Sequence, residues 1–391
     1  MPLRYLTAGE SHGPMLSAIL EGLPAGIKID QEALNQQLYR RQLGYGAGPR
    51  MKLERDTARI ISGVMAGETT GAPIGLLIEN RIYKNWHGKP IPPLTSPRPG
   101  HADLTAAAKF GYSDFRPSLE RASARETAAR VAVGALCRQF LDIFGIEIGG
   151  YVRSVGNVEA DIDHIPVEQR AALAEENEVR CPDPEWAERF RQRIRAVMDE
   201  RNTLGGVLEI IVFGLPVGLG SHVHWDRKLE ARLGAAVLGV QAMKGVEIGP
   251  AFENTRKPGT QVQDAIELGE DGQLTRPTNR AGGIEGGISN GQPLVVRAAM
   301  KPIATTLTPQ RTVDLVSGQP TDTVYQRSDF CPVPRAVPIL EAVIAYVLAD
   351  ALIEKIGGDS IDEMRPRFER LRRLTLGDLQ IDGDEVTWWP D

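Results

Sequence analysis

The sequence predicts an α+β fold made of two related halves that pack as one unit. A short internal repeat carries this prediction: GIEIG at 145–149 and GVEIG at 245–249 start 100 residues apart, and each follows an alanine-rich helical pattern. A Ser-His pair also precedes each half, at 11–12 and 221–222. Self-similarity of this kind is typical of repeated structural units, although five-residue repeats with two glycines also arise by chance.

Composition and charge restrict the class of protein. The chain has 391 residues, which alone would allow about two or three domains. Its net charge of −6 provides no basic field for nucleic acid or a membrane, so local arginine clusters must hold any anion. Three distant cysteines without a C-x-x-C pair favour a reducing compartment. No signal peptide is evident, and the longest apolar run, 337–349, is shorter than the ~20 residues of a membrane span. We expect a cytoplasmic protein.

The first part of the chain predicts short strands and one helix. Apolar patterns place strands at 3–8, 15–20, 58–62 and 74–79. Asp30 is the expected N-cap of a helix that runs to Gln42, with Leu34 and Leu38 facing inward. The proline-rich segment 85–99 has the length of a functional loop.

The stretch from Arg98 to Leu136 leads from a loop into a helix. Ser123 and Glu126 fit the S-x-x-E capping box, in which each side chain binds the other residue's backbone N–H. The apolar residues that follow recur at helical spacing and are mostly small: Ala128, Val131, Ala132, Ala135 and Leu136. Because small side chains let a neighbouring backbone come close, we expect this helix to be internal.

The second half predicts three further helices. Asp183 and Pro184 begin the first, and Asp226 is the expected N-cap of the second. The third has Pro338 near its first position and ends at Ile356, and it is apolar nearly all round, which indicates burial. Between the second and third helices, a glycine-dense loop is expected at 281–291 and a strand at 294–299, while an earlier strand is expected at 207–213.

The loop that begins the 98–136 stretch contains candidate residues for proton transfer and anion binding. His101 is the side chain there best able to exchange a proton near neutral pH. Arg116, Arg121 and Arg125 approach the helix start, where free N–H groups attract anions. This pattern suggests an anionic ligand and proton transfer, and solvated arginines beside a loop histidine are an equally good interpretation of spacing alone.

Residues 9–13 fit G-x-S-x-G, the nucleophile elbow of α/β-hydrolases. Only eight residues precede this motif, and a strand is expected after it instead of the helix that the elbow requires. What remains is Ser11 and His12 held by glycines, either close to a ligand or in a simple tight turn.

The other candidate motifs are weaker. His222, His224 and Asp226 have metal-like spacing without a fourth ligand nearby, so we expect no dedicated metal site. Neither G-x-G-x-x-G nor G-x-x-x-x-G-K-[ST] occurs, which argues against the usual dinucleotide and ATP sites. The 282–291 loop suits close backbone approach to a flat or phosphorylated ligand, or is a surface loop. Two further groups have two interpretations each. Lys301 with Thr305 could hold a phosphate, or Lys301 is merely solvated; Asp329 could be a base, or the ion-pair partner of Arg327.

Taken together, these segments are similar to the chorismate synthase family over almost the whole chain. Eight segments carry the resemblance, in order: TAGESHG (7–13), RRQLGYG (40–46), RPGHADL (98–104), ERASARETAARVAVGA (120–135), QAMKGVEIG (241–249), NRAGGIEGGISNGQP (279–293), MKPIAT (300–305) and RSDFCPVPRAVP (327–338). The resemblance implies a β-α-β sandwich, one domain over 1–391, and usually a homotetramer. It implies a lyase that converts 5-enolpyruvylshikimate 3-phosphate to chorismate and phosphate by 1,4-anti elimination, the last step of the shikimate pathway, with reduced FMN and no net redox change.

The resemblance also implies roles for individual residues. His12 matches the histidine that protonates the departing phosphate, His101 the one that protonates the flavin, and Asp329 with Ser11 the group that relays a proton at flavin N5. The matching FMN-binding residues are Arg121, Ala122, Ser123, Gln241, Ala242, Gly286, Lys301, Pro302, Ile303, Ala304, Thr305 and Arg327.

A basic loop implies a further contact with substrate or NADP. Arg41 matches a basic position that the family links to substrate or pyridine nucleotide. A second arginine of that loop in the family is Ala47 here, which puts NADPH-driven flavin reduction in doubt. Arg50 could substitute for it. Two other hypotheses remain: a serine hydrolase that uses Ser11, and a flavin-binding module without catalysis.

Overall fold

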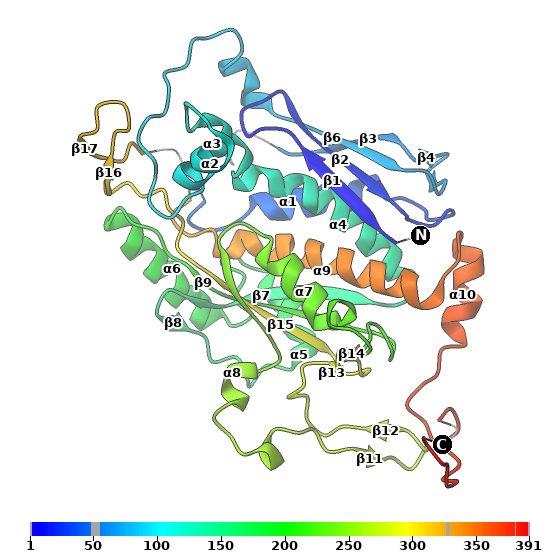
Figure 1. The fold of residues 1–391 in the computed structure, drawn as a ribbon. Helices are drawn as coiled ribbons and strands as arrows, with labels where there is room; N and C mark the ends of the chain where they lie inside the picture. The colour runs from blue at the N-terminus through cyan, green and yellow to red at the C-terminus, as the bar shows by residue number, and fades with distance from the viewer. Residues whose placement is uncertain (1, 48–54, 326–328, 380, 390–391) are drawn as a thin grey trace.

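Two antiparallel sheets enclose a layer of helices (Figure 1). The computed structural model describes residues 2–47, 55–325, 329–379 and 381–389. The first sheet has the order β1-β2-β6-β3 and the second β10-β15-β9-β7-β8. Their strands are β1 (Arg4–Ala8), β2 (Met15–Glu21), β3 (Ala58–Ser62), β6 (Ile74–Glu79), β7 (Glu147–Val155), β8 (Val158–Glu159), β9 (Gly206–Phe213), β10 (Met243–Ile248) and β15 (Leu294–Met300). The predicted β-α-β sandwich is confirmed.

Four helices form the middle layer: α1 (Gln31–Gln42), α4 (Thr127–Asp142), α7 (Leu229–Leu238) and α9 (Val333–Ile356). α4 packs on β2 and β6 of the first sheet and on α9, and α9 packs on β7 and β9 of the second. A Cβ added at Gly134 would lie 2.4 Å from the Cα of Ala342, closer than any side chain allows. The small residues of α4 therefore serve close helix–helix contact, as the sequence predicted.

Helix α9 begins earlier than its proline suggested. It starts at Val333, so Pro338 lies inside the helix and not at its first position. A proline has no N–H to bond the carbonyl four residues earlier, and that carbonyl, of Pro334, instead accepts from Arg180 Nη1 at 2.6 Å. With 24 residues and mean hydropathy 2.0, α9 could span a membrane by composition, but 89% of its most apolar window is buried in the protein.

The internal repeat corresponds to a pseudo-two-fold arrangement in the second sheet. GIEIG begins β7, and GVEIG lies in β10, and these strands flank the central pair β9–β15. Ile148 pairs with Val212 of β9, and Ile248 pairs with Val296 of β15, so the sheet has the same pairing from either side. The two Ser-His pairs are not equivalent: the first joins β1 to β2, and the second precedes α7.

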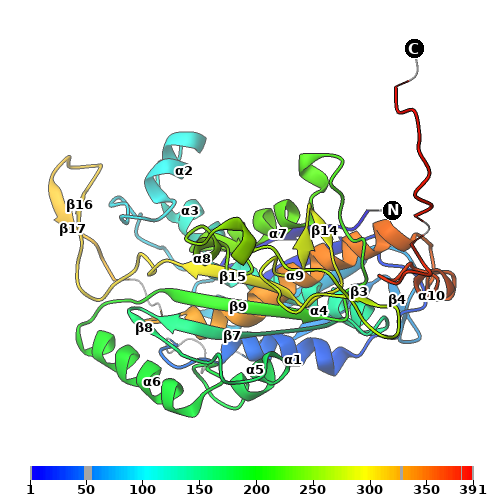
Figure 2. The same ribbon diagram turned by 90° about the horizontal axis from the view of Figure 1, so that it is seen from below.

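The remaining elements lie around this sandwich. α5 packs on β7, and α6 packs on β7 and β8, beside that edge of the second sheet (Figure 2). Helices α2, α3, α5, α8 and α10 were not foreseen from the sequence, and the predicted 281–291 loop contains a short hairpin, β13–β14. The bounds of the outer elements are α2 (Asp103–Phe110), α3 (Arg116–Arg121), α5 (Val167–Ala174), α6 (Pro184–Asp199), α8 (Ala251–Asn254), α10 (Ile361–Glu369), β4 (Val64–Met65), β5 (Glu68–Thr69), β11 (Glu267–Leu268), β12 (Leu274–Thr275), β13 (Ile284–Glu285), β14 (Ile288–Ser289), β16 (Arg311–Val313) and β17 (Pro320–Asp322).

Two of the predicted helix caps are confirmed, and two are wrong. Asp30 and Asp183 each accept from two backbone N–H groups at the start of their helices. Ser123 instead accepts from Arg125 N, because a 3₁₀ turn over 124–126 precedes α4. Asp226 is not the N-cap of α7: that residue is Lys228, since a 3₁₀ turn over 225–227 intervenes.

Candidate active site

The turn that carries His12 is anchored on both sides. It joins β1 to β2 and begins at Gly9, whose φ of 109° favours glycine and where a Cβ would lie 2.5 Å from Met15 O. Asn80, at the end of β6, donates through Nδ2 to the carbonyls of Glu10 (3.0 Å) and Gly13 (2.8 Å). Hydrogen bonds from the Asn80 side chain to the backbone thus hold the turn in place. The segment after the turn is the strand β2, as expected.

Glu120 of α3 binds His12 twice. One carboxylate oxygen accepts from the His12 backbone N–H at 2.7 Å, and the other lies 2.8 Å from the ring Nδ1. The Trp86 ring lies against the imidazole, with centroids 4.3 Å apart. Burial raises the pKa of Glu120, but hydrogen bonds from His12 and nearby charges outweigh it and lower that pKa overall.

Ser11 and Ser123 meet beside this histidine. Ser11 is buried, and its backbone N–H donates to the carbonyl of Glu120 at 3.3 Å. The two hydroxyls are 3.3 Å apart, which joins the β1–β2 turn to the start of α4. The structure therefore brings together Ser11, His12 and Ser123, three residues that the sequence singled out separately.

Arg121 and Gln241 belong to the same region through Thr7 and Glu126. Arg121 donates to the backbone oxygen of Thr7 at 2.8 Å. The Glu126 carboxylate accepts from Thr7 Oγ1 (2.6 Å), Gln241 Nε2 (3.2 Å) and Arg130, so it does not return to Ser123 as a capping box requires. The Gln241 Oε1 atom is buried and has no hydrogen-bond partner within the described part of the chain.

The second histidine has its own carboxylate. His101 Nδ1 lies 2.7 Å from Asp103 Oδ1. Asp103 also accepts from Arg98 through Nε (2.8 Å) and Nη2 (2.9 Å), and Arg98 Nη1 reaches Thr305 Oγ1 at 3.5 Å. Burial raises the pKa of Asp103, but hydrogen bonds from His101 and Arg98 prevail and lower that pKa far below its ordinary value.

Lys301 connects the two histidine regions. Its backbone N–H donates to Ala242 O at 3.0 Å, and its Nζ donates to Gly100 O at 2.7 Å. Ala242 follows Gln241 and has φ of 67°, an uncommon conformation for alanine. Residues 302–304 continue from Lys301, and Ile303 O accepts from Thr203 Oγ1 at 2.9 Å.

Asp329 lies with a third group of charges. It is paired with Arg335, whose Nε donates to the backbone oxygen of Arg41 at 3.1 Å. Arg41 is buried, and its Nη1 makes no hydrogen bond to the described residues, although it lies 3.5 Å from Asp56 Oδ2. Burial above all, together with the neighbouring charge of Arg335, lowers the pKa of Arg41 to about 9.

Arg125 is already committed to an internal ion pair. Its Nη1 lies 2.7 and 2.6 Å from the two oxygens of Asp56, and its Nε donates to Asn80 Oδ1 at 2.8 Å. Arg116 lies over the Trp86 ring. The expectation that Arg116, Arg121 and Arg125 all converge on one anion is therefore wrong for Arg125, because a buried aspartate neutralises it.

The predicted residues thus form linked groups and not one contact cluster. Among the described residues, no hydrogen bond or ion pair joins His12, His101 and Asp329 directly. Gly286 has φ of 58° in the turn of the β13–β14 hairpin, next to residues that contact the start of α7. Arg50 and Arg327 lie outside the described residues, while Ala122 lies between Arg121 and Ser123.

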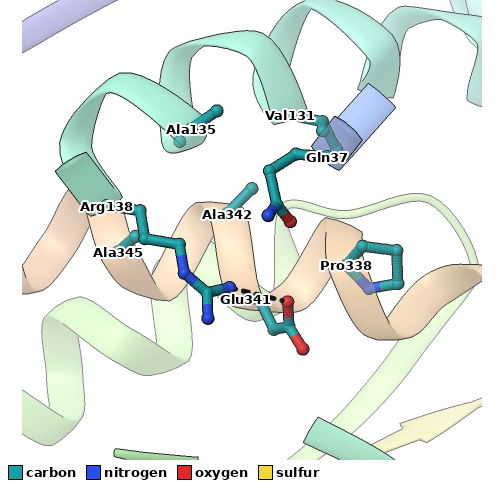
Figure 3. Close-up of a pocket in the computed structure, with 9 residues that line it drawn as sticks. Gln37, Val131, Ala135, Arg138, Pro338, Glu341, Ala342 and Ala345 are labelled. Atoms are coloured by element: carbon teal, nitrogen blue, oxygen red, sulfur yellow. Dashed lines mark hydrogen bonds and ion pairs between the residues drawn. The ribbon is translucent and has the colours of Figure 1, made fainter. Parts of the chain in front are cut away.

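Two hollows elsewhere contain none of the predicted site residues. A cavity of about 10 Å³ between α1, α4 and α9 is lined by Gln37, Arg138 and Glu341 among others, and Arg138 pairs with Glu341 there (Figure 3). This is close to the volume that one water molecule requires. A wider depression of about 610 Å³ lies between β8 and α6.

Several residues of the site were missed in the sequence. Glu120 and Trp86 contact His12, and Asp103 and Arg98 contact His101. Asp103, the first residue of α2, follows His101 by two residues, a spacing that could have indicated a pair. Glu120 gives no comparable signal, because its partner is distant in the chain.

Comparison with known proteins assigns these motifs to one family. A family model described as chorismate synthase matches residues 3–353. The chain is 51% identical over 383 residues to the chorismate synthase of Geobacter sulfurreducens, with 94% of this chain and 98% of that protein covered. It is 52% identical over 379 residues to that of Trichlorobacter lovleyi, with 93% and 97% covered. A solved structure titled "Crystal Structure of Chorismate Synthase" is similar with a TM-score of 0.78 and 43% identity, covering 94% of this chain and 97% of that one.

Proposed function

The chain belongs to the chorismate synthase family, and from this premise we propose that it is the shikimate pathway lyase that converts 5-enolpyruvylshikimate 3-phosphate to chorismate and phosphate. The reaction is a 1,4-anti elimination, in which phosphate and one ring hydrogen leave and a double bond forms. The observation that carries the proposal is that each of the two histidines in the family-matching motifs has Nδ1 beside a carboxylate. Nε2 of His12 is then available for proton exchange, while Nε2 of His101 also lies 3.3 Å from Arg98 Nη2.

His12 is the proposed proton donor to the departing phosphate. Its Nδ1 faces Glu120, and a proton held at Nε2 would neutralise charge as the phosphate leaves. A positioned general acid contributes about 10²–10⁴-fold in rate. The substrate carries two carboxylates and a phosphate, and the buried Arg41 has an Nη1 without a hydrogen bond in the described chain, which suits an anionic ligand.

The residues around Gln241 fit a bound flavin. The buried Oε1 of Gln241 has no donor among the described residues. The next residue, Ala242, accepts from the Lys301 backbone N–H, and the Lys301 ammonium donates to Gly100 O, so polar groups surround this segment. Reduced FMN, when bound, would supply electron density to the substrate and recover it without net redox change. Its proposed contacts are Arg121, Ala122, Ser123, Gln241, Ala242, Gly286, Lys301, Pro302, Ile303, Ala304, Thr305 and Arg327.

His101 and Asp329 are the other two residues that we propose transfer a proton. His101, whose Nδ1 faces Asp103 and whose Nε2 lies 3.3 Å from Arg98 Nη2, would protonate the flavin. Asp329, together with Ser11, would relay a proton at the flavin N5 position. Binding of substrate or NADP by Arg41 and Arg50, reduction by NADPH, a homotetramer, a cytoplasmic location and a single unit over 1–391 all stay predictions.

An anaerobic assay tests the proposed function. We expect the purified chain, given dithionite-reduced FMN and 5-enolpyruvylshikimate 3-phosphate, to produce chorismate absorbance and free phosphate in equal amounts. Repeating the assay with NADPH in place of dithionite tests flavin reduction separately. Flavin binding without chorismate would indicate a binding module, and labelling of Ser11 by a fluorophosphonate would favour a hydrolase.

A further inference from the structure

Glu120 holds His12 by more contacts than an ion pair requires. Its two carboxylate oxygens bind the backbone and the ring of the same residue, at 2.7 and 2.8 Å. We propose that Glu120 is a positioning residue that fixes the tautomer and the orientation of His12. This inference rests on the proposed function, because it gives His12 a proton to transfer.

The tautomer follows from the chemistry of the contact. An ionised carboxylate only accepts hydrogen bonds, so the ring nitrogen that faces it must carry a hydrogen. Nδ1 of His12 faces Glu120 Oε1, so Nδ1 is the N–H, and Nε2 is the atom that exchanges a proton. A backbone contact to the same carboxylate prevents the ring and its partner from moving apart independently.

Glu120 is itself held in place. It lies in the last turn of the short helix α3, and its backbone oxygen accepts from Ser11 N at 3.3 Å. Its side chain is only 10% exposed, against 23% for His12, so the carboxylate lies behind the ring and the ring lies nearer the solvent. This arrangement suits an orienting group and not a group that meets substrate.

The charged groups around His12 leave Glu120 as its direct ionic partner. Arg116, also on α3, is 4.0 Å from Glu120, and its guanidinium lies over Trp86. The 81–87 segment presents the uncharged ring of Trp86 to the imidazole, and Arg121 is bonded to the β1 backbone. Glu10 on the same turn lies near Gly13.

Kinetics of two Glu120 variants test the proposal. In Glu120→Gln the amide can either donate or accept, so both tautomers become possible and kcat should fall at least about 10-fold, with KM for the substrate changed less than about 3-fold. Glu120→Asp keeps the charge and should recover part of the loss. Circular dichroism and flavin affinity show whether each variant is folded.

A spectroscopic measurement tests the tautomer without substrate. The chain has six histidines, so ¹⁵N-histidine labelling, with His12→Ala to assign the signal, is practicable. The wild type should show a protonated Nδ1 and an unprotonated Nε2 at high pH, and Glu120→Gln should show a mixture. Asp226→Asn is the matched control, since it removes an exposed histidine partner and should change neither the His12 signal nor kcat.

The outcomes separate this inference from the proposed function. If His12→Ala loses turnover but Glu120→Gln keeps both wild-type kcat and the Nδ1–H signal, the positioning role is wrong and the proposed function stands. If His12→Ala is fully active, the role of His12 itself fails. Equal loss in Glu120→Gln and Glu120→Asp, with an unchanged tautomer, would also overturn the proposal.

Discussion

The two histidine–carboxylate pairs of the candidate site have similar contacts and different surroundings. The ring contacts are 2.8 Å for His12–Glu120 and 2.7 Å for His101–Asp103. Glu120 binds the backbone and ring of one residue, whereas Asp103 divides its oxygens between His101 and Arg98. Glu120 is thus a partner dedicated to His12, so its replacement should affect one ring only. Asp103 is a shared partner, so its replacement should also affect Arg98 and the loop around it.

The largest expected effect comes from removing the rings themselves. His12→Ala should lower turnover about 10²–10⁴-fold, since a general acid is lost, and His101→Ala should lower it at least about 10-fold. Flavin affinity and circular dichroism should be retained in both. Anaerobic turnover with reduced FMN measures the effect, and wild-type turnover in either variant would refute the role given to that histidine.

Asp103→Asn should break the shared pair more broadly than Glu120→Gln breaks the dedicated one. An asparagine cannot accept fully from both His101 and Arg98, so the loop that carries Gly100, and through it Lys301, should loosen. We expect turnover to fall about 10-fold or more and flavin affinity to weaken as well. Flavin titration of both variants tests this difference. If flavin affinity decreased in Glu120→Gln and not in Asp103→Asn, the pair that also supports the flavin site would be His12–Glu120.

The two pairs also differ in how far the sequence predicted them. His101 and Asp103 are two residues apart, where the loop meets the start of α2, so their pairing is local and visible in the spacing. His12 and Glu120 are 108 residues apart and meet only because β1, β2 and α3 come together in the fold. Tertiary pairing of this kind leaves no local pattern, which is why the sequence identified the histidine and missed its partner.

The fold shows the same division between local and tertiary causes. The strands of the first sheet, the Asp30 cap and the small-residue face of α4 follow from local patterns and were predicted. The early start of α9 was not, because it requires Arg180 to satisfy the Pro334 carbonyl that Pro338 leaves free. The Ser123 capping box also failed, because distant groups such as Thr7 take the carboxylate of Glu126.

Acid should weaken both pairs, and the shared one more strongly. A carboxyl group whose pKa is lowered by folding stabilises the fold above its unfolded pKa, and this contribution is lost as the pH falls toward the folded value. Despite burial, which raises it, the pKa of Glu120 is lowered from 4.5, and that of Asp103 is lowered further from 3.8. The free energy of unfolding should therefore fall below about pH 4.5.

Urea unfolding at a series of acidic pH values measures this loss. Replacing Asp103 by Asn should flatten the pH dependence more than replacing Glu120 by Gln, because the pKa of Asp103 is lowered further. Parallel curves for wild type and Asp103→Asn would show that this carboxylate does not contribute to acid sensitivity.

The smallest effect is expected from a third pair that has the same geometry at an exposed position. His224 Nδ1 lies 2.7 Å from Asp226, but the two side chains are 62% and 57% exposed. Water solvates both groups when the contact is lost, so exposed pairs contribute little. Asp226→Asn should leave turnover within about 2-fold of wild type and the urea midpoint unchanged. A loss comparable to that of Glu120→Gln would mean that the loop before α7 takes part in the reaction, and that burial is not what distinguishes the functional pairs.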